Sequence, residues 1–79
     1  MTAEPRLSQA FRIALELQPD VDVKTLAYGQ HPHWDSVGHM ALVAEIEDTF
    51  GITVETDDVL QLSSYPKAVE LLHRLEDAA

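Results

Sequence analysis

Apolar side chains recur at helical spacing, three or four positions apart, in several stretches of the chain. The first stretch covers residues 7–17, and Pro19 ends it. The second covers residues 36–50, where Asp35 is suited to cap the N-terminus of a helix and Gly51 is suited to end it. These two stretches predict two of the helices that build the core.

The C-terminal part of the chain predicts one short and one longer helix. Residues 57–60 are a candidate short helix, and Ser63 or Ser64 followed by Pro66 opens a last helix through Leu75. The buried stripe of this last helix is expected to consist of Val69, Leu71, Leu72 and Leu75. No repeat or linker interrupts residues 1–79, so we predict an all-α fold in one domain, a small bundle of three main helices and one short helix.

Residues 18–35 contain two prolines, Gly29 and no sustained period, and they predict a long loop with one helical turn near residues 24–28. Its apolar side chains, expected to hold it to the core, are Val21, Val23, Leu26 and Tyr28. Long loops in compact domains are usually functional. This one delivers the chain to Asp35 and Ser36.

The helix predicted over residues 36–50 carries two apolar faces. One face consists of Leu42, Val43, Ile46 and Phe50. The other consists of Val37, Met40, Ala41 and Ala44, with Glu47 and Asp48 beside them. Either both faces are core, or the second is presented to partners. An apolar centre with a charged border is the usual anatomy of a transient docking site, which favours the second alternative.

Charge and composition narrow the classes of partner. The 79 residues are 46% hydrophobic and carry a formal charge of −9, which repels nucleic acid and anionic membranes and attracts basic protein surfaces. No apolar run approaches the length of a membrane span and no signal peptide is recognisable, so we expect a cytoplasmic monomer.

The residues that could carry metal or catalytic chemistry are few. No cysteine is present, which excludes disulfides, thiolate metal sites and a cysteine nucleophile. The four histidines, His31, His33, His39 and His73, lack the spacing of a zinc set, and we expect no bound metal. Ser36 and His39 have no identifiable third partner for a catalytic triad, so we expect no catalytic residue and no enzyme.

Ser36 occupies the start of the second helix, where unpaired backbone N–H groups and the helix dipole favour an anion. A capping role is the plain alternative for an Asp-Ser pair in this place. Three neighbours also have open interpretations. Gly38 either admits close approach of an enzyme or reflects tolerance near a helix end. His39 is expected to be buried at the mouth of the bundle. Trp34 is either a loop anchor or an exposed partner contact.

The string from Trp34 to Ile52, WDSVGHMALVAEIEDTFGI, resembles the acyl carrier protein family. In that family an Asp-Ser-Leu motif opens the second helix, apolar residues follow in a fixed pattern, and an acidic stretch leads to Phe-Gly-Ile. The resemblance continues through residues 53–58 and Ser63-Ser64-Tyr65, so that residues 35–75 are covered well and residues 1–34 only in outline. It implies a four-helix bundle of acyl-carrier-protein type.

The resemblance implies that Asp35-Ser36 is the attachment motif, with 4'-phosphopantetheine joined to Ser36 by a phosphopantetheinyl transferase that takes it from coenzyme A. An acyl group would be held as a thioester on that arm, as in fatty-acid or polyketide biosynthesis. Acyl-loading and acyl-processing enzymes with basic surfaces would contact a partner-binding face, which comprises Val37, Met40, Ala41, Ala44, Glu47 and Asp48.

Departures from the family pattern point to a specialised pathway. Val37 replaces the common leucine, Ala41 stands where fatty-acid carriers usually have glutamate, and Glu55 replaces a frequent proline. Residues 31–34 replace the common Leu-Gly-x stretch. Two alternatives stay open. The first is a peptidyl or aminoacyl carrier of a nonribosomal-type system, which the strong acidity and Asp35 disfavour mildly. The second is a carrier-like binding module that is never modified.

Overall fold

In the computed structural model, which describes residues 4–78, helices account for most of the chain. Its elements are α1 (Glu4–Ala14), the 3-10 turn η1 (Val23–Thr25), α2 (Ser36–Phe50), α3 (Thr56–Gln61) and α4 (Tyr65–Ala78). Within the described residues the only β-type pairing is an isolated bridge between Ala27 and Ser64. The predicted all-α bundle of three longer helices and one short helix is confirmed.

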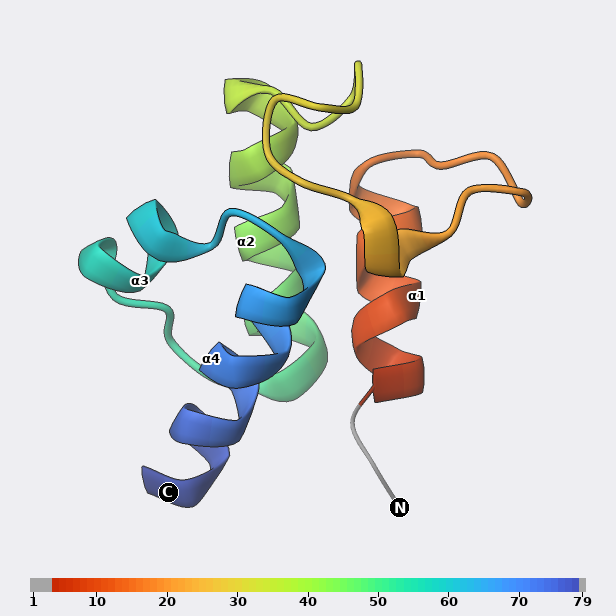
Figure 1. The fold of residues 1–79 in the computed structure, drawn as a ribbon. Helices are drawn as coiled ribbons and strands as arrows, with labels where there is room; N and C mark the ends of the chain where they lie inside the picture. The colour runs from red at the N-terminus through yellow and green to blue at the C-terminus, as the bar shows by residue number, and fades with distance from the viewer. Residues whose placement is uncertain (1–3, 79) are drawn as a thin grey trace.

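α1 runs alongside α2, and α3 lies on the other side of α2 in this view (Figure 1). The start of α4 meets α1, where the rings of Tyr65 and Phe11 pack edge-on with centroids 5.2 Å apart. The long connection between α1 and α2 reaches the end of the bundle at which α2 begins (Figure 1). Among the side chains that the structure describes, sixteen apolar ones form the core, and the largest fully buried ones are Trp34, Phe11, Leu7, Leu15, Leu42, Ile46 and Leu62. Every helix except the short α3 contributes to this core, and Val59 of α3 packs against it.

α1 ends three residues earlier than the apolar periodicity predicts, at Ala14. Glu16 adopts a left-handed conformation with φ of 51°. The N–H of Glu16 donates to the carbonyl of Ile13 (3.4 Å) and that of Leu17 to the carbonyl of Arg12 (3.1 Å), which is a Schellman ending. The Arg12 guanidinium then donates to the carbonyl of Val21 at 2.9 Å, so the helix end is tied to the loop.

Replacing Glu16 with glycine is expected to stabilise the protein by about 1 kcal/mol, because glycine occupies the left-handed region without the Cβ penalty. Urea unfolding monitored by circular dichroism measures the change. As a matched control, Gln9→Gly in the middle of α1, also a position outside the core, is expected to destabilise by about 1 kcal/mol. Loss of stability in both variants would contradict the left-handed assignment at Glu16.

The predicted bounds of the second helix are confirmed at both ends. The Asp35 carboxylate accepts the N–H of Gly38 at 2.9 Å, and Gly51 ends α2 in the left-handed region with φ of 64°. The face predicted to meet the core does so: Leu42, Val43 and Ile46 are buried and Phe50 is half-buried.

The loop predicted between α1 and α2 contains one helical turn, η1, slightly earlier than expected. Val23 and Leu26 are buried as predicted, and Val21 is half-buried. The Tyr28 side chain is 44% exposed, but its ring packs edge-on against the buried Trp34 and against His39, so it holds the loop at the edge of the core. Its backbone N–H adds a second anchor by donating to the carbonyl of Ser63 at 2.8 Å.

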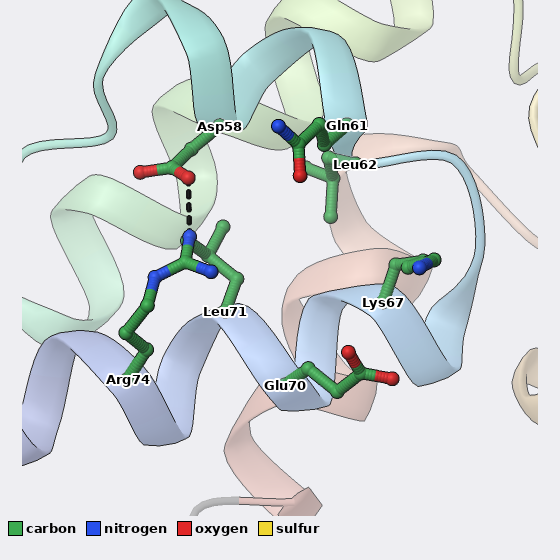
Figure 2. Close-up of a pocket in the computed structure, with 7 residues that line it drawn as sticks. All are labelled: Asp58, Gln61, Leu62, Lys67, Glu70, Leu71 and Arg74. Atoms are coloured by element: carbon green, nitrogen blue, oxygen red, sulfur yellow. Dashed lines mark hydrogen bonds and ion pairs between the residues drawn. The ribbon is translucent and has the colours of Figure 1, made fainter.

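The C-terminal helices follow the predicted order. The Ser64 hydroxyl accepts the N–H of Lys67 at 3.3 Å, as expected for a cap of α4. In the predicted stripe Leu71 and Leu72 are buried and Val69 and Leu75 half-buried. Figure 2 shows the ion pair between Asp58 of α3 and Arg74 of α4, which connects the two helices. Within residues 4–78, no helix has both the length and the apolar character needed to cross a bilayer.

Candidate functional site

Ser36 is the first residue of α2 and is exposed, as is Asp35 before it. The loop brings this pair to the end of the bundle where α2 begins (Figure 1). One carboxylate oxygen of Asp35 caps the helix, and the Asp35 carbonyl accepts the N–H of His39 at 2.8 Å. Capping is therefore performed by Asp35, which leaves the Ser36 side chain accessible at the N-terminus of the helix.

The second apolar face of α2 is exposed, so the alternative in which both faces are core is wrong. Val37 is 77% exposed and Met40 59% exposed, and Ala41 and Ala44 are also exposed. Leu60 on α3 is 77% exposed as well. The sequence pattern did not single out Leu60, because a six-residue helix is too short to show a periodic apolar face.

The two acidic residues predicted beside this face differ in their surroundings. Asp48 is exposed. Glu47 is half-buried, and its carboxylate accepts the N–H of Val54 at 2.8 Å. Glu47 thus holds the segment between α2 and α3 against α2, and its negative charge is partly used inside the protein.

Trp34 is a loop anchor, with a side chain that is 0% exposed. Its indole N–H donates to Nδ1 of His39 at 2.9 Å, and Nε2 of His39 lies 2.8 Å from the carbonyl oxygen of Val59. An indole N–H only donates and a carbonyl only accepts, so His39 is the neutral tautomer with its proton on Nε2. This half-buried histidine joins the loop, α2 and α3 through two hydrogen bonds.

Replacing His39 with alanine is expected to destabilise the protein by about 1–3 kcal/mol, because the buried indole N–H of Trp34 loses its partner. Urea unfolding followed by the fluorescence of this single tryptophan measures the loss. His39→Gln, which offers one acceptor and one donor, is expected to lose less. The exposed His73→Ala on α4 is the control and should remain within about 0.5 kcal/mol of the parent.

Gly38 is required by the protein's own loop, so the alternative that it only reflects tolerance near a helix end is wrong, while the close approach of an enzyme stays a prediction. A Cβ at this position would lie 1.9 Å from the carbonyl oxygen of His33 and 3.2 Å from Cδ2 of Leu15. Nδ1 of His33 lies 2.8 Å from the carbonyl oxygen of Leu15 and donates its proton there. The loop before Ser36 is thereby held between the end of α1 and the start of α2.

Two surface grooves flank the first turns of α2. The first groove, of about 290 Å³, lies between the end of α1 and the start of α2, and Asp35, Val37 and Gly38 contribute to its lining. The second, of about 260 Å³, lies between α2 and α3 and is lined by Tyr28, His39, Val59, Leu60, Leu62 and Ser63. A third hollow, of only about 40 Å³, surrounds the Asp58–Arg74 ion pair between α3 and α4 (Figure 2).

Two of the histidines are engaged in loop structure. His33 donates to Leu15 through Nδ1, and Nδ1 of His31 accepts the backbone N–H of His33 at 3.1 Å. Among the side chains that the structure describes, those of residues 5–75, histidines and carboxylates form no group of three or more that could hold a metal ion.

Comparison of the chain with protein-family models, with curated proteins and with solved structures finds no match in any of the three.

Proposed function

We propose that this chain is a discrete acyl carrier protein with the four-helix fold of that family. It carries 4'-phosphopantetheine on Ser36 and catalyses no reaction itself. The observation that carries the proposal is the placement of Ser36. It is exposed at the first position of α2, next to a helix-capping aspartate and at one end of an exposed apolar face. The sequence resemblance over residues 34–52 supports the same assignment.

The residues around Ser36 fit a phosphodiester-linked group. The positive end of the α2 dipole lies at this serine and favours the negative charge of a phosphate. Asp35 keeps the first turn formed, because its carboxylate holds Gly38 and its carbonyl holds His39. When bound, the group would supply the terminal thiol that holds an acyl cargo as a thioester, which the cysteine-free chain does not offer.

The exposed face of α2 is the proposed contact surface for a phosphopantetheinyl transferase and for acyl-loading and acyl-processing enzymes. Its apolar centre consists of Val37, Met40, Ala41 and Ala44, and Asp48 provides an exposed charge near its end. Partners with basic surfaces match the formal charge of −9. Because coenzyme A supplies the arm, a cytoplasmic setting in a specialised biosynthetic pathway is part of the proposal.

A second candidate is a binding module that docks through the same face without modification. The exposure of Val37 and Met40 favours it, because an apolar docking face would serve a partner whether or not Ser36 is modified. An aminoacyl carrier would use the same serine and differs in the enzyme that loads it, an adenylating enzyme instead of an acyltransferase.

The test is modification of the purified protein by coenzyme A and a broad-specificity phosphopantetheinyl transferase, followed by intact-mass and peptide mass spectrometry. We expect the mass increment of one phosphopantetheine, located on the peptide that contains Ser36. A folded protein that stays unmodified, under conditions in which a known carrier is converted, would contradict the proposal and favour the unmodified module.

A further inference from the structure

The groove between α1 and α2 lies beside Ser36, which is not itself one of its lining residues. Both chain neighbours of this serine, Asp35 and Val37, line it. In the groove between α2 and α3, the α2 residue that contributes is His39, almost one helical turn further along. A flexible group attached to the Ser36 oxygen therefore starts at the edge of the first groove.

The first groove combines apolar surface with polar atoms. Ala14, Leu15 and Ala41 contribute apolar surface, and Glu16 and His33 contribute polar groups. Because Nδ1 of His33 is used by the Leu15 carbonyl, Nε2 is the ring nitrogen left to contact a group in the groove, and in the neutral tautomer it accepts a hydrogen bond. A pantetheine arm has methyl groups beside amides and a hydroxyl, so its amide and hydroxyl protons match this acceptor and its methyl groups match the alanine and leucine side chains.

The second groove fits the arm less well. Its apolar side chains include Val59, Leu60 and Leu62. Both ring nitrogens of His39 are used, one by the Trp34 indole and one by the Val59 carbonyl. The histidine therefore has no polar atom left for an amide, and the polar side chains that remain in this groove are those of Tyr28 and Ser63. The second groove is less well placed for the arm, because both chain neighbours of Ser36 line the first groove and neither lines the second.

We propose that the phosphopantetheine arm, when no partner enzyme holds it, rests in the groove between α1 and α2, with His33 accepting a hydrogen bond from it and Ala14 and Ala41 forming its apolar walls. The inference rests on the proposed function, because it requires an arm on Ser36. In this arrangement His33 positions the arm, and the groove between α2 and α3 does not hold the arm.

The experiment compares ¹H–¹⁵N spectra of the unmodified protein and of the protein carrying unloaded phosphopantetheine, with complete conversion verified by intact mass. Beyond the residues next to Ser36, we expect shift changes at residues 14–16 and at His33. Residues 59–63 should change little. A reversed pattern, or changes confined to residues 35–37, would overturn the inference while leaving the proposed function intact.

A matched pair of variants tests the groove directly. Ala41 and Ala44 are both exposed on α2, but only Ala41 lines the groove. In Ala41→Phe, the added ring is expected to fill the groove and remove most of the modification-dependent shifts at residues 14–16. In Ala44→Phe these shifts should persist. Because both alanines also lie on the proposed transferase-contact face, the spectra are recorded after prolonged treatment with excess transferase and with full conversion of each variant verified by intact mass. Equal behaviour of the two modified variants would overturn the inference, and a parent protein that never gains the arm would overturn both this inference and the proposed function.

Discussion

Replacing Gly38 with alanine is expected to destabilise the protein by about 1–3 kcal/mol, the range typical of overpacked positions. Helix propensity alone predicts the opposite sign, since alanine inside a helix is favoured over glycine by about 1 kcal/mol. Sterics should dominate because the new Cβ would lie 1.9 Å from the backbone carbonyl oxygen of His33. A backbone atom cannot rotate away as a flexible side chain could, so the loop before Ser36 must shift.

Urea unfolding of the Gly38→Ala variant measures this change in the free energy of unfolding. Ala44→Gly, on the exposed side of the same helix, reports the propensity effect without the clash and should cost about 1 kcal/mol. Spectral changes in Gly38→Ala should extend to His33 and Leu15, whose atoms lie nearest the added methyl group. A variant more stable than the parent would show that the loop does not approach α2 as the structure describes.

Replacing Ser36 with alanine is expected to abolish phosphopantetheine transfer completely, because no other hydroxyl would occupy the start of α2 beside Asp35. The fold should be retained, since Ser36 is exposed and the Asp35 carboxylate supplies the helix cap. Intact mass after treatment with coenzyme A and transferase measures the loss. Circular dichroism and thermal unfolding establish that the variant is folded.

Ser63→Ala is the matched control for this loss. Ser63 is also exposed, but it lies before α4 and not at the start of α2, so the variant should be modified as completely as the parent. Transfer to the Ser36→Ala protein at any other residue would contradict the assignment of the attachment site. If a partner enzyme is found, unchanged activity of the Ser36→Ala variant in its presence would favour the unmodified binding module.

The sequence by itself determined the elements whose signals are local. Asp35 and Gly51 set the two ends of α2, because a capping carboxylate and a left-handed glycine act within one turn of the helix. The two faces of α2 were also readable, since helical spacing separates Leu42 and Ile46 from Val37 and Met40. For the same reason the local pattern alone places the candidate attachment residue, Ser36, at the start of a helix.

Only the tertiary structure decided which segments meet. The end of α1 is set by a left-handed glutamate, Glu16, a conformation for which the sequence carries no glycine signal. Trp34 and His39 are joined because the loop and α3 converge on α2, and Gly38 is needed because a loop carbonyl packs against it. These features depend on contacts between different elements of the fold, and helical periodicity reports only on neighbours within one helix.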